Sequence, residues 1–143
     1  MKVGVTGTRS GITPLQKAAL ESLLHELAPS ELHHSDCTGA DYACANLANS
    51  CSIRTVAHPG ESRGIYRAYH KSTVILLPQN NLERNRLIVR SCDLMIALLA
   101  GEGEILRSGT WMTIRYSRKL LRPLIIIYPR GIISRERTAE GGC

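Results

Sequence analysis

The stretch that decides the fold is residues 2–15, KVGVTGTRSGITPL. Residues 2–6 have the β-branched, apolar character of a short strand, and Thr13 followed by Pro14 is typical of a helix N-cap with proline at the first helical position. A strand, a loop with glycines and a helix in this order begin a βαβ unit.

The same alternation continues along the chain. Further strands are predicted at residues 31–36, 53–57, 93–98 and 124–128, and helices at 14–27, 40–49, 82–91 and 109–120. The apolar run at 74–77 has the periodicity of a strand, but Pro78 and its basic surroundings weigh against that assignment. We therefore predict an α/β, Rossmann-like, doubly wound fold with a mostly parallel five-stranded sheet flanked by helices. Residues 1–130 form one domain in this prediction, and residues 131–143 form a flexible polar tail.

Composition limits the classes of partner. No stretch approaches the roughly 20 apolar residues of a membrane helix, and the amino terminus lacks a signal-peptide core, so we expect a cytoplasmic protein without a membrane partner. The net charge of +6 favours anionic partners, either small phosphates or polymers.

The cysteines and histidines do not predict a metal or cofactor site. None of the five cysteines stands in a C-x-x-C pair, and Cys37, Cys44 and Cys51 recur every seven residues as packing positions do. His33 and His34 are adjacent, so in a strand they point to opposite faces and do not share a metal.

Ligands of open parallel sheets bind beyond the carboxyl ends of the strands, so the residues just after each strand are the candidates for ligand binding. These candidates are Gly7, Thr8 and Arg9 after the first strand, Asp36, Thr38, Gly39 and Asp41 after the second, His58 after the third, and Arg107, Ser108, Gly109 and Thr110 before the last helix. The loops around Gly39 and Gly109 precede helices, where free backbone N–H groups and the helix dipole favour phosphate.

Two further positions have an alternative role beside packing. Glu83 and Arg84 begin a helix, where the arginine is placed to hold a phosphate or carboxylate through paired hydrogen bonds. Trp111 is a core or interface residue, or it stacks on a base if it faces the crevice.

Five segments together resemble the SLOG superfamily, and within it the small bacterial and phage YspA-like proteins. They are residues 7–9, 34–41, 58–59, 83–86 and 106–111, and the resemblance covers about residues 2–130. It implies a Rossmann-like fold, a nucleotide-type ligand and association into dimers or larger homo-oligomers.

Relatives in that superfamily include LOG phosphoribohydrolases, DNA-binding DprA proteins and sensors of nucleotide second messengers. LOG enzymes use an arginine, matched here by Arg84, and a glutamate whose position falls on Thr113. Threonine cannot stabilise an oxocarbenium-like centre as a carboxylate does. If the protein is an enzyme, Arg84 and Asp41 are the catalytic candidates, with Asp36, Glu83, Glu102 or Glu104 as other sources of a carboxylate.

The residues, together with what the resemblance implies, give three candidate functions. The first is a sensor or sequestering protein for a nucleotide-derived signal, such as a cyclic nucleotide or an ADP-ribose derivative, in a defence or anti-defence sponge role. The second is a nucleotide N-glycosidase, and the third is single-stranded DNA binding. Dispersed basic residues and the absence of Phe rank DNA last.

Overall fold

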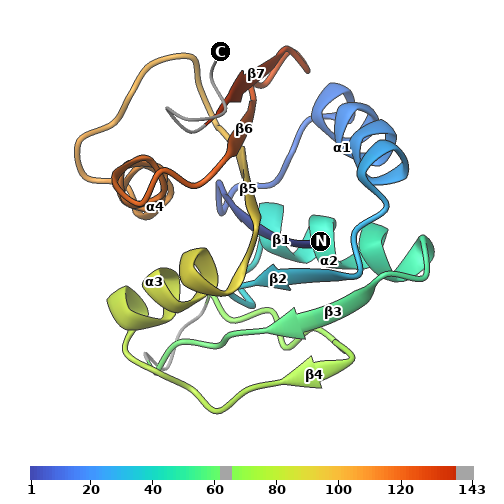
Figure 1. Ribbon diagram of the computed structural model, residues 1–143, viewed down its shortest axis with the longest axis vertical. Helices are drawn as coiled ribbons and strands as arrows, with labels where there is room; N and C mark the ends of the chain where they lie inside the picture. The colour runs from blue at the N-terminus through green and yellow to red at the C-terminus, as the bar shows by residue number, and fades with distance from the viewer. Residues whose placement is uncertain (62–65, 138–143) are drawn as a thin grey trace.

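Figure 1 shows a central sheet with helices on both sides. The computed structural model describes residues 1–61 and 66–137. Its elements, in chain order, are β1 (Lys2–Gly7), α1 (Pro14–Leu27), β2 (Glu31–His34), α2 (Ala40–Ser50), β3 (Arg54–Ala57), β4 (Val74–Ile75), α3 (Asn81–Ser91), β5 (Leu94–Leu98), α4 (Gly109–Lys119), β6 (Leu124–Ile127) and β7 (Ile133–Glu136).

The strands are ordered β4-β3-β2-β1-β5-β6-β7 across the sheet, and every neighbouring pair is parallel except β6 and β7. From β1 the chain builds outward through β2 and β3 to β4, then returns to place β5 on the other side of β1. This reversal defines a topological switch point between β1 and β5. The predicted doubly wound, Rossmann-like α/β fold is confirmed.

The core lies on both faces of the sheet because each face is covered by two helices. Along β5, Leu94, Ile96 and Leu98 belong to the apolar cluster with α1 and α2, while Met95 and Ala97 belong to the cluster with α3 and α4. A strand buried on both faces is apolar throughout, which explains the continuous run LMIAL.

The predicted number of five strands is wrong, because the sheet has seven. Val74–Ile75 forms the short edge strand β4 beside β3, despite the proline that follows. The second addition is β7, which pairs antiparallel with β6 and lies in the predicted flexible tail. That prediction is wrong for residues 133–136; residues 138–143 of the predicted tail lie outside the described residues.

A tight turn explains β7. The N–H of Gly131 donates to the carbonyl of Tyr128 at 2.8 Å, and Gly131 has a φ of +84°, a conformation that glycine adopts without strain. The returning strand then covers the outer edge of β6, and Glu136 pairs with Arg118 of α4 at 2.8 Å. Backbone pairing to an apolar neighbour therefore outweighs the polar composition of this strand.

β2 is shorter than predicted, because it ends at His34. The chain turns at Asp36, which has a φ of +55°. Asp36 then anchors a distant segment. Its carboxylate accepts hydrogen bonds from the N–H of His70 at 2.9 Å and from Nε of Arg67 at 3.1 Å. This holds residues 66–70 against the carboxyl edge of the sheet.

Candidate functional site

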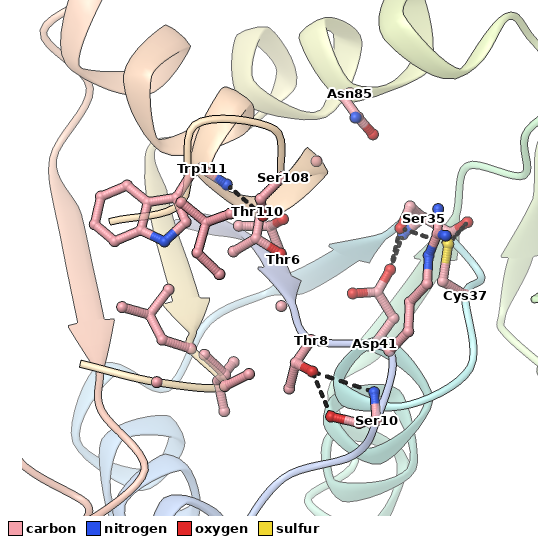
Figure 2. Close-up of a pocket in the computed structure, with 18 of the residues that line it drawn as sticks. Thr6, Thr8, Ser10, Ser35, Cys37, Asp41, Asn85, Ser108, Thr110 and Trp111 are labelled. Atoms are coloured by element: carbon pink, nitrogen blue, oxygen red, sulfur yellow. Dashed lines mark hydrogen bonds between the residues drawn. The ribbon is translucent and has the colours of Figure 1, made fainter. Parts of the chain in front are cut away.

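A pocket of about 510 Å³ opens at the carboxyl edge of the sheet, and residues at the ends of β1 and β5 form its floor. It therefore lies at the switch point of the strand order. Its volume falls within the roughly 300–1,000 Å³ typical of small-molecule sites. Figure 2 shows Thr6 at the back of the pocket, with side chains of α4, of the β1–α1 loop and of the β2–α2 loop around it.

Close backbone contacts position the wall after β1. A Cβ on Gly7 would lie 2.5 Å from the Cβ of Ala40, so only glycine lets β1 approach α2 this closely. Thr8 connects the end of β1 to β5 and α2. Its N–H donates to the carbonyl of Leu98 in β5 at 3.1 Å, and its carbonyl accepts from the N–H of Ala40 in α2 at 2.8 Å. The Thr8 hydroxyl also accepts from the N–H of Ser10 at 3.1 Å, which curls the loop around the pocket.

The amino end of α4 forms the facing wall. Ser108 is the N-cap, and its hydroxyl accepts from the N–H of Trp111 at 3.3 Å. No described residue accepts from the N–H groups of Gly109 and Thr110, as expected for the first turn of a helix. These two donors and the positive end of the helix dipole are available to an anion in the pocket.

The wall after β2 carries a buried carboxyl group. Asp41 accepts hydrogen bonds from the N–H of Ser35 at 2.8 Å and from the Ser35 hydroxyl. Burial raises the pKa of Asp41, while these hydrogen bonds and the charge of Arg84 act against that rise. Burial also raises the pKa of the neighbouring Cys37 thiol, so the thiol form is favoured.

Arg84 reaches this wall from the first turn of α3 and is only 5% exposed. Its guanidinium donates to the carbonyl of Ser35 at 3.0 Å, to the carbonyl of His58 at 3.3 Å and to the side-chain oxygen of Asn85 at 2.6 Å. All three acceptors are neutral, and no described carboxylate forms an ion pair with Arg84. Its guanidinium is therefore held in place without a directly paired carboxylate, although its charge still acts on Asp41.

The charge of the pocket is positive. Arg9, Arg84 and Arg107 line it, and Asp41 is the only carboxylate among the described lining residues. Such an excess favours an anionic ligand.

Nine of the residues predicted for ligand binding line the pocket: Gly7, Thr8, Arg9, Asp41, Arg84, Arg107, Ser108, Gly109 and Thr110. The other five do not line it. Asp36 and Thr38 hold residues 66–70 in place, since the N–H of Thr38 donates to Tyr66 at 2.7 Å. Glu83 is exposed and pairs with Arg86 at 3.4 Å.

Gly39 and His58 also lie outside the pocket but support it. Gly39 has a φ of +88°, and a Cβ there would lie 2.5 Å from the backbone of Arg9. His58 is buried behind Arg84, and its Nε2 lies 2.8 Å from Nδ1 of His33. Burial lowers the pKa of His58 to about 4, so it is neutral at physiological pH.

Several lining residues were not among the predicted ones. Thr6, Ser10, Ser35, Asn85 and Ile105 line the pocket in addition. Ser35 and Asn85 are sequence neighbours of the predicted residues Asp36 and Arg84. That adjacency could have identified them as pocket residues. Ile105 lies in the loop between β5 and α4. The conformation of this loop brings its side chain to the pocket, and no local sequence pattern predicted that conformation.

Two positions from the family resemblance are now located. Trp111 is 7% exposed, belongs to the apolar core under α4 and also lines the pocket. Thr113, at the position of the LOG glutamate, is buried, and its hydroxyl donates to the carbonyl of Gly109 at 3.0 Å. It does not line the pocket.

The rim of the pocket is the loop between β5 and α4, residues 99–108. Two exposed apolar side chains stand on it, Ile105 and Leu106. The loop is tied to α4 from outside, because Arg115 pairs with Glu104 at 2.8 Å and donates to the carbonyl of Leu106 at 2.9 Å.

The part of the chain that the structure describes lacks two other kinds of feature. No group of three or more His, Cys, Asp or Glu side chains is arranged to hold a metal there. No helix in those residues has the length and apolar character needed to span a membrane.

No protein-family model matches the sequence, and no curated protein sequence matches it. Solved structures do match the fold. The molybdenum cofactor binding protein from the phototrophic bacterium Rippkaea orientalis is 20% identical with a TM-score of 0.67, and the match covers 89% of this chain and 76% of that one. The molybdenum cofactor carrier protein of Chlamydomonas reinhardtii is 16% identical with a TM-score of 0.62, over 87% of this chain and 74% of that one.

The DNA processing protein A (DprA) of Streptococcus pneumoniae is 19% identical with a TM-score of 0.67, over 87% of this chain and 49% of that one. These likenesses support the Rossmann-like fold. The resemblance to the SLOG superfamily, and within it to YspA-like proteins, stays a prediction.

Proposed function

We propose that this protein binds a phosphate-bearing, nucleotide-derived small molecule in the pocket between β1 and β5, and acts as a sensor or sequestering protein for it. The observation that carries the proposal is the pairing of two features across one pocket. Free N–H groups at the amino end of α4 lie on one wall, and the buried Arg84, which forms no ion pair with a described carboxylate, lies on another. A phosphate suits both, because it accepts several hydrogen bonds and carries negative charge.

The residue at the position of the LOG glutamate supports binding over turnover. Thr113 stands where LOG enzymes have a glutamate, and it is turned into α4. Glu102 and Glu104 are engaged with Arg130 and Arg115 and do not line the pocket. Two neighbours in fold are, by name, binding and carrier proteins for a small-molecule cofactor, which agrees with a binding role.

The test is to incubate the purified protein with a mixed pool of nucleoside monophosphates, cyclic dinucleotides and cyclic ADP-ribose isomers. After washing and denaturation, mass spectrometry identifies the released compound. We expect one intact compound in about equimolar amount. Thr110→Pro, which removes an N–H at the amino end of α4, and Arg84→Gln should each lower retention at least about tenfold.

A matched control is Arg86→Gln, two residues along α3 at a half-exposed position outside this pocket. Retention by this variant should equal that of the unchanged protein. If the unchanged protein retains none of these compounds, the proposal is wrong.

One observation favours a second candidate, a nucleotide N-glycosidase. Asp41 lines the pocket, and its raised pKa suits a carboxyl that gives a proton to a leaving group. In that case the same incubation yields free base and ribose phosphate, and Asp41→Asn abolishes their formation while the nucleotide is still bound.

A further inference from the structure

A smaller hollow of about 40 Å³ adjoins the main pocket. Arg9, Ser35, Cys37 and Arg84 line both, so the two spaces share a wall. Arg67 and Tyr66 line only the smaller hollow. A single water needs about 10–15 Å³ of such volume, so the hollow admits a group the size of a few waters, such as a phosphate.

The smaller hollow has more positive than negative charge. Arg9, Arg67 and Arg84 line it, and Asp36 is the only carboxylate among its described lining residues. Both oxygens of Asp36 are already used, one by Arg67 and one by the N–H of His70. Asp36 therefore pairs with Arg67, and neither Arg9 nor Arg84 forms an ion pair with a described carboxylate.

The arginines are also fixed in place before any ligand arrives. The guanidinium of Arg9 lies 4.3 Å from the centre of the Tyr66 ring, and that of Arg67 lies 4.4 Å from the ring of Tyr69. Arg84 is the strongest indicator, because the residue is only 5% exposed and its guanidinium donates only to neutral acceptors. A bound anion would stabilise a buried charge of this kind. Stacked and bonded arginines lose little freedom on binding.

We infer that the ligand carries two separated anionic groups: one at the amino end of α4 and one in the hollow formed by Arg9, Arg67 and Arg84. This inference rests on the proposed function and names its ligand class. Figure 2 shows Ser108 and Thr110 across the pocket from Ser35 and Cys37. Ser35 and Cys37 also line the hollow. A nucleoside 3′,5′-bisphosphate, which carries one phosphate on either side of its sugar, belongs to this ligand class.

The experiment compares the ribonucleoside 5′-monophosphates with the corresponding 3′,5′-bisphosphates by isothermal titration calorimetry. We expect the preferred bisphosphate to bind about tenfold or more tightly than its monophosphate, the gain of one well-placed charge-assisted contact. Arg67→Gln should remove this difference and leave the affinity for the monophosphate unchanged, because Arg67 does not line the main pocket.

A second variant avoids disturbing Asp36. Tyr66→Leu removes the ring under Arg9 at a side chain that is 45% exposed, and should reduce the preference for the bisphosphate severalfold. Arg54→Gln, an exposed arginine on β3 outside both spaces, is the control and should keep the full preference. Retained binding of the monophosphate shows that each variant is folded.

The outcomes separate the two proposals. Equal affinities for the monophosphate and the bisphosphate, or a preference that survives Arg67→Gln, would overturn the second anion site and leave the proposed function standing. Binding of neither compound by the unchanged protein, together with no retained compound in the mass-spectrometric test, would overturn both.

Discussion

At the scale of single residues, the pocket depends on places where side chains are absent. Gly7 and Gly39 bring β1, α2 and the β1–α1 loop together at distances that any Cβ would prevent. Gly39 was predicted to touch the ligand as part of a phosphate loop. In the structure Gly39 has a steric role, because it lets the β2–α2 turn lie directly against the backbone of Thr8 and Arg9.

Gly39→Ala should therefore destabilise the protein. Its φ of +88° and ψ of −128° are strained for alanine, and the new Cβ would lie 2.5 Å from Arg9. We expect a loss in the free energy of unfolding on the order of 3 kcal/mol, measured by urea denaturation. Gly101→Ala is the control, since nothing lies within 4 Å of its Cβ, and it should change stability by less than about 0.5 kcal/mol.

Sequence reasoning placed residues in the pocket where backbone geometry decides their position. Because ligands of parallel sheets bind beyond the carboxyl ends of the strands, Ser108, Gly109 and Thr110 were expected at this edge, and they line the pocket. Asp36 and His58 also follow strands but do not line it. Their partners, His70 with Arg67 and His33, come from other parts of the chain, and no local pattern specifies which distant group a polar side chain will meet.

At the scale of elements, helices and strands with a strong apolar periodicity were predicted at the correct positions. Elements with a weak apolar periodicity were not. α1 begins and ends where the cap, proline and apolar spacing indicated, and its Thr13 and Gln16 form a reciprocal capping box. β7 was missed, because four residues with two charges resemble a tail. Its strand conformation comes from pairing with β6, a contact that the local sequence does not encode.

Removing β7 should cost stability out of proportion to its size. A chain that ends after Gly131 exposes one edge of β6, whose four residues are all buried, and loses the ion pair between Arg118 and Glu136. We expect a loss of about 2 to 4 kcal/mol in the free energy of unfolding and faster hydrogen exchange at the amides of β6.

A chain that ends after Arg137 keeps all of β7 and is the matched control. Equal stability of the two shortened chains would show that β7 does not contribute to holding the sheet together.

At the scale of the whole molecule, buried histidines on the two faces of the sheet connect stability to pH. His33 contacts His58 on one face, and His34 bonds Ser72 and through it His70 on the other, as expected for adjacent strand residues. Burial lowers the pKa of His34 from 6.5 to about 3 and that of His58 to about 4. Both are therefore neutral in the folded state over most of the acidic range.

Stability should fall as the pH falls. Below about pH 6.5 the unfolded chain takes up protons at these histidines while the folded protein does not, until the pH approaches the lowered values. Each histidine then contributes a slope of about 1.4 kcal/mol per pH unit. The raised pKa of Asp41 acts in the opposite direction and offsets part of the loss near the ordinary aspartate range.

The check is urea denaturation at several pH values between about 7 and 5. His34→Gln should reduce the slope of the free energy of unfolding against pH by the contribution of one histidine, about 1.4 kcal/mol per pH unit. The exposed His25→Gln on α1 should leave the slope as it was. An unchanged slope in His34→Gln would contradict the assignment of the pH dependence to this residue.

The rim loop of the pocket has a consequence for how such a protein changes over evolutionary time. Residues 102–107 are exposed, belong to no helix or strand and are fastened to α4 mainly through Arg115. Substitutions at Ile105, which lines the pocket, thus alter the surface of the pocket without disturbing the sheet. Changes in what the pocket accepts can therefore accumulate at this loop, while the sheet and the amino end of α4 stay as they are.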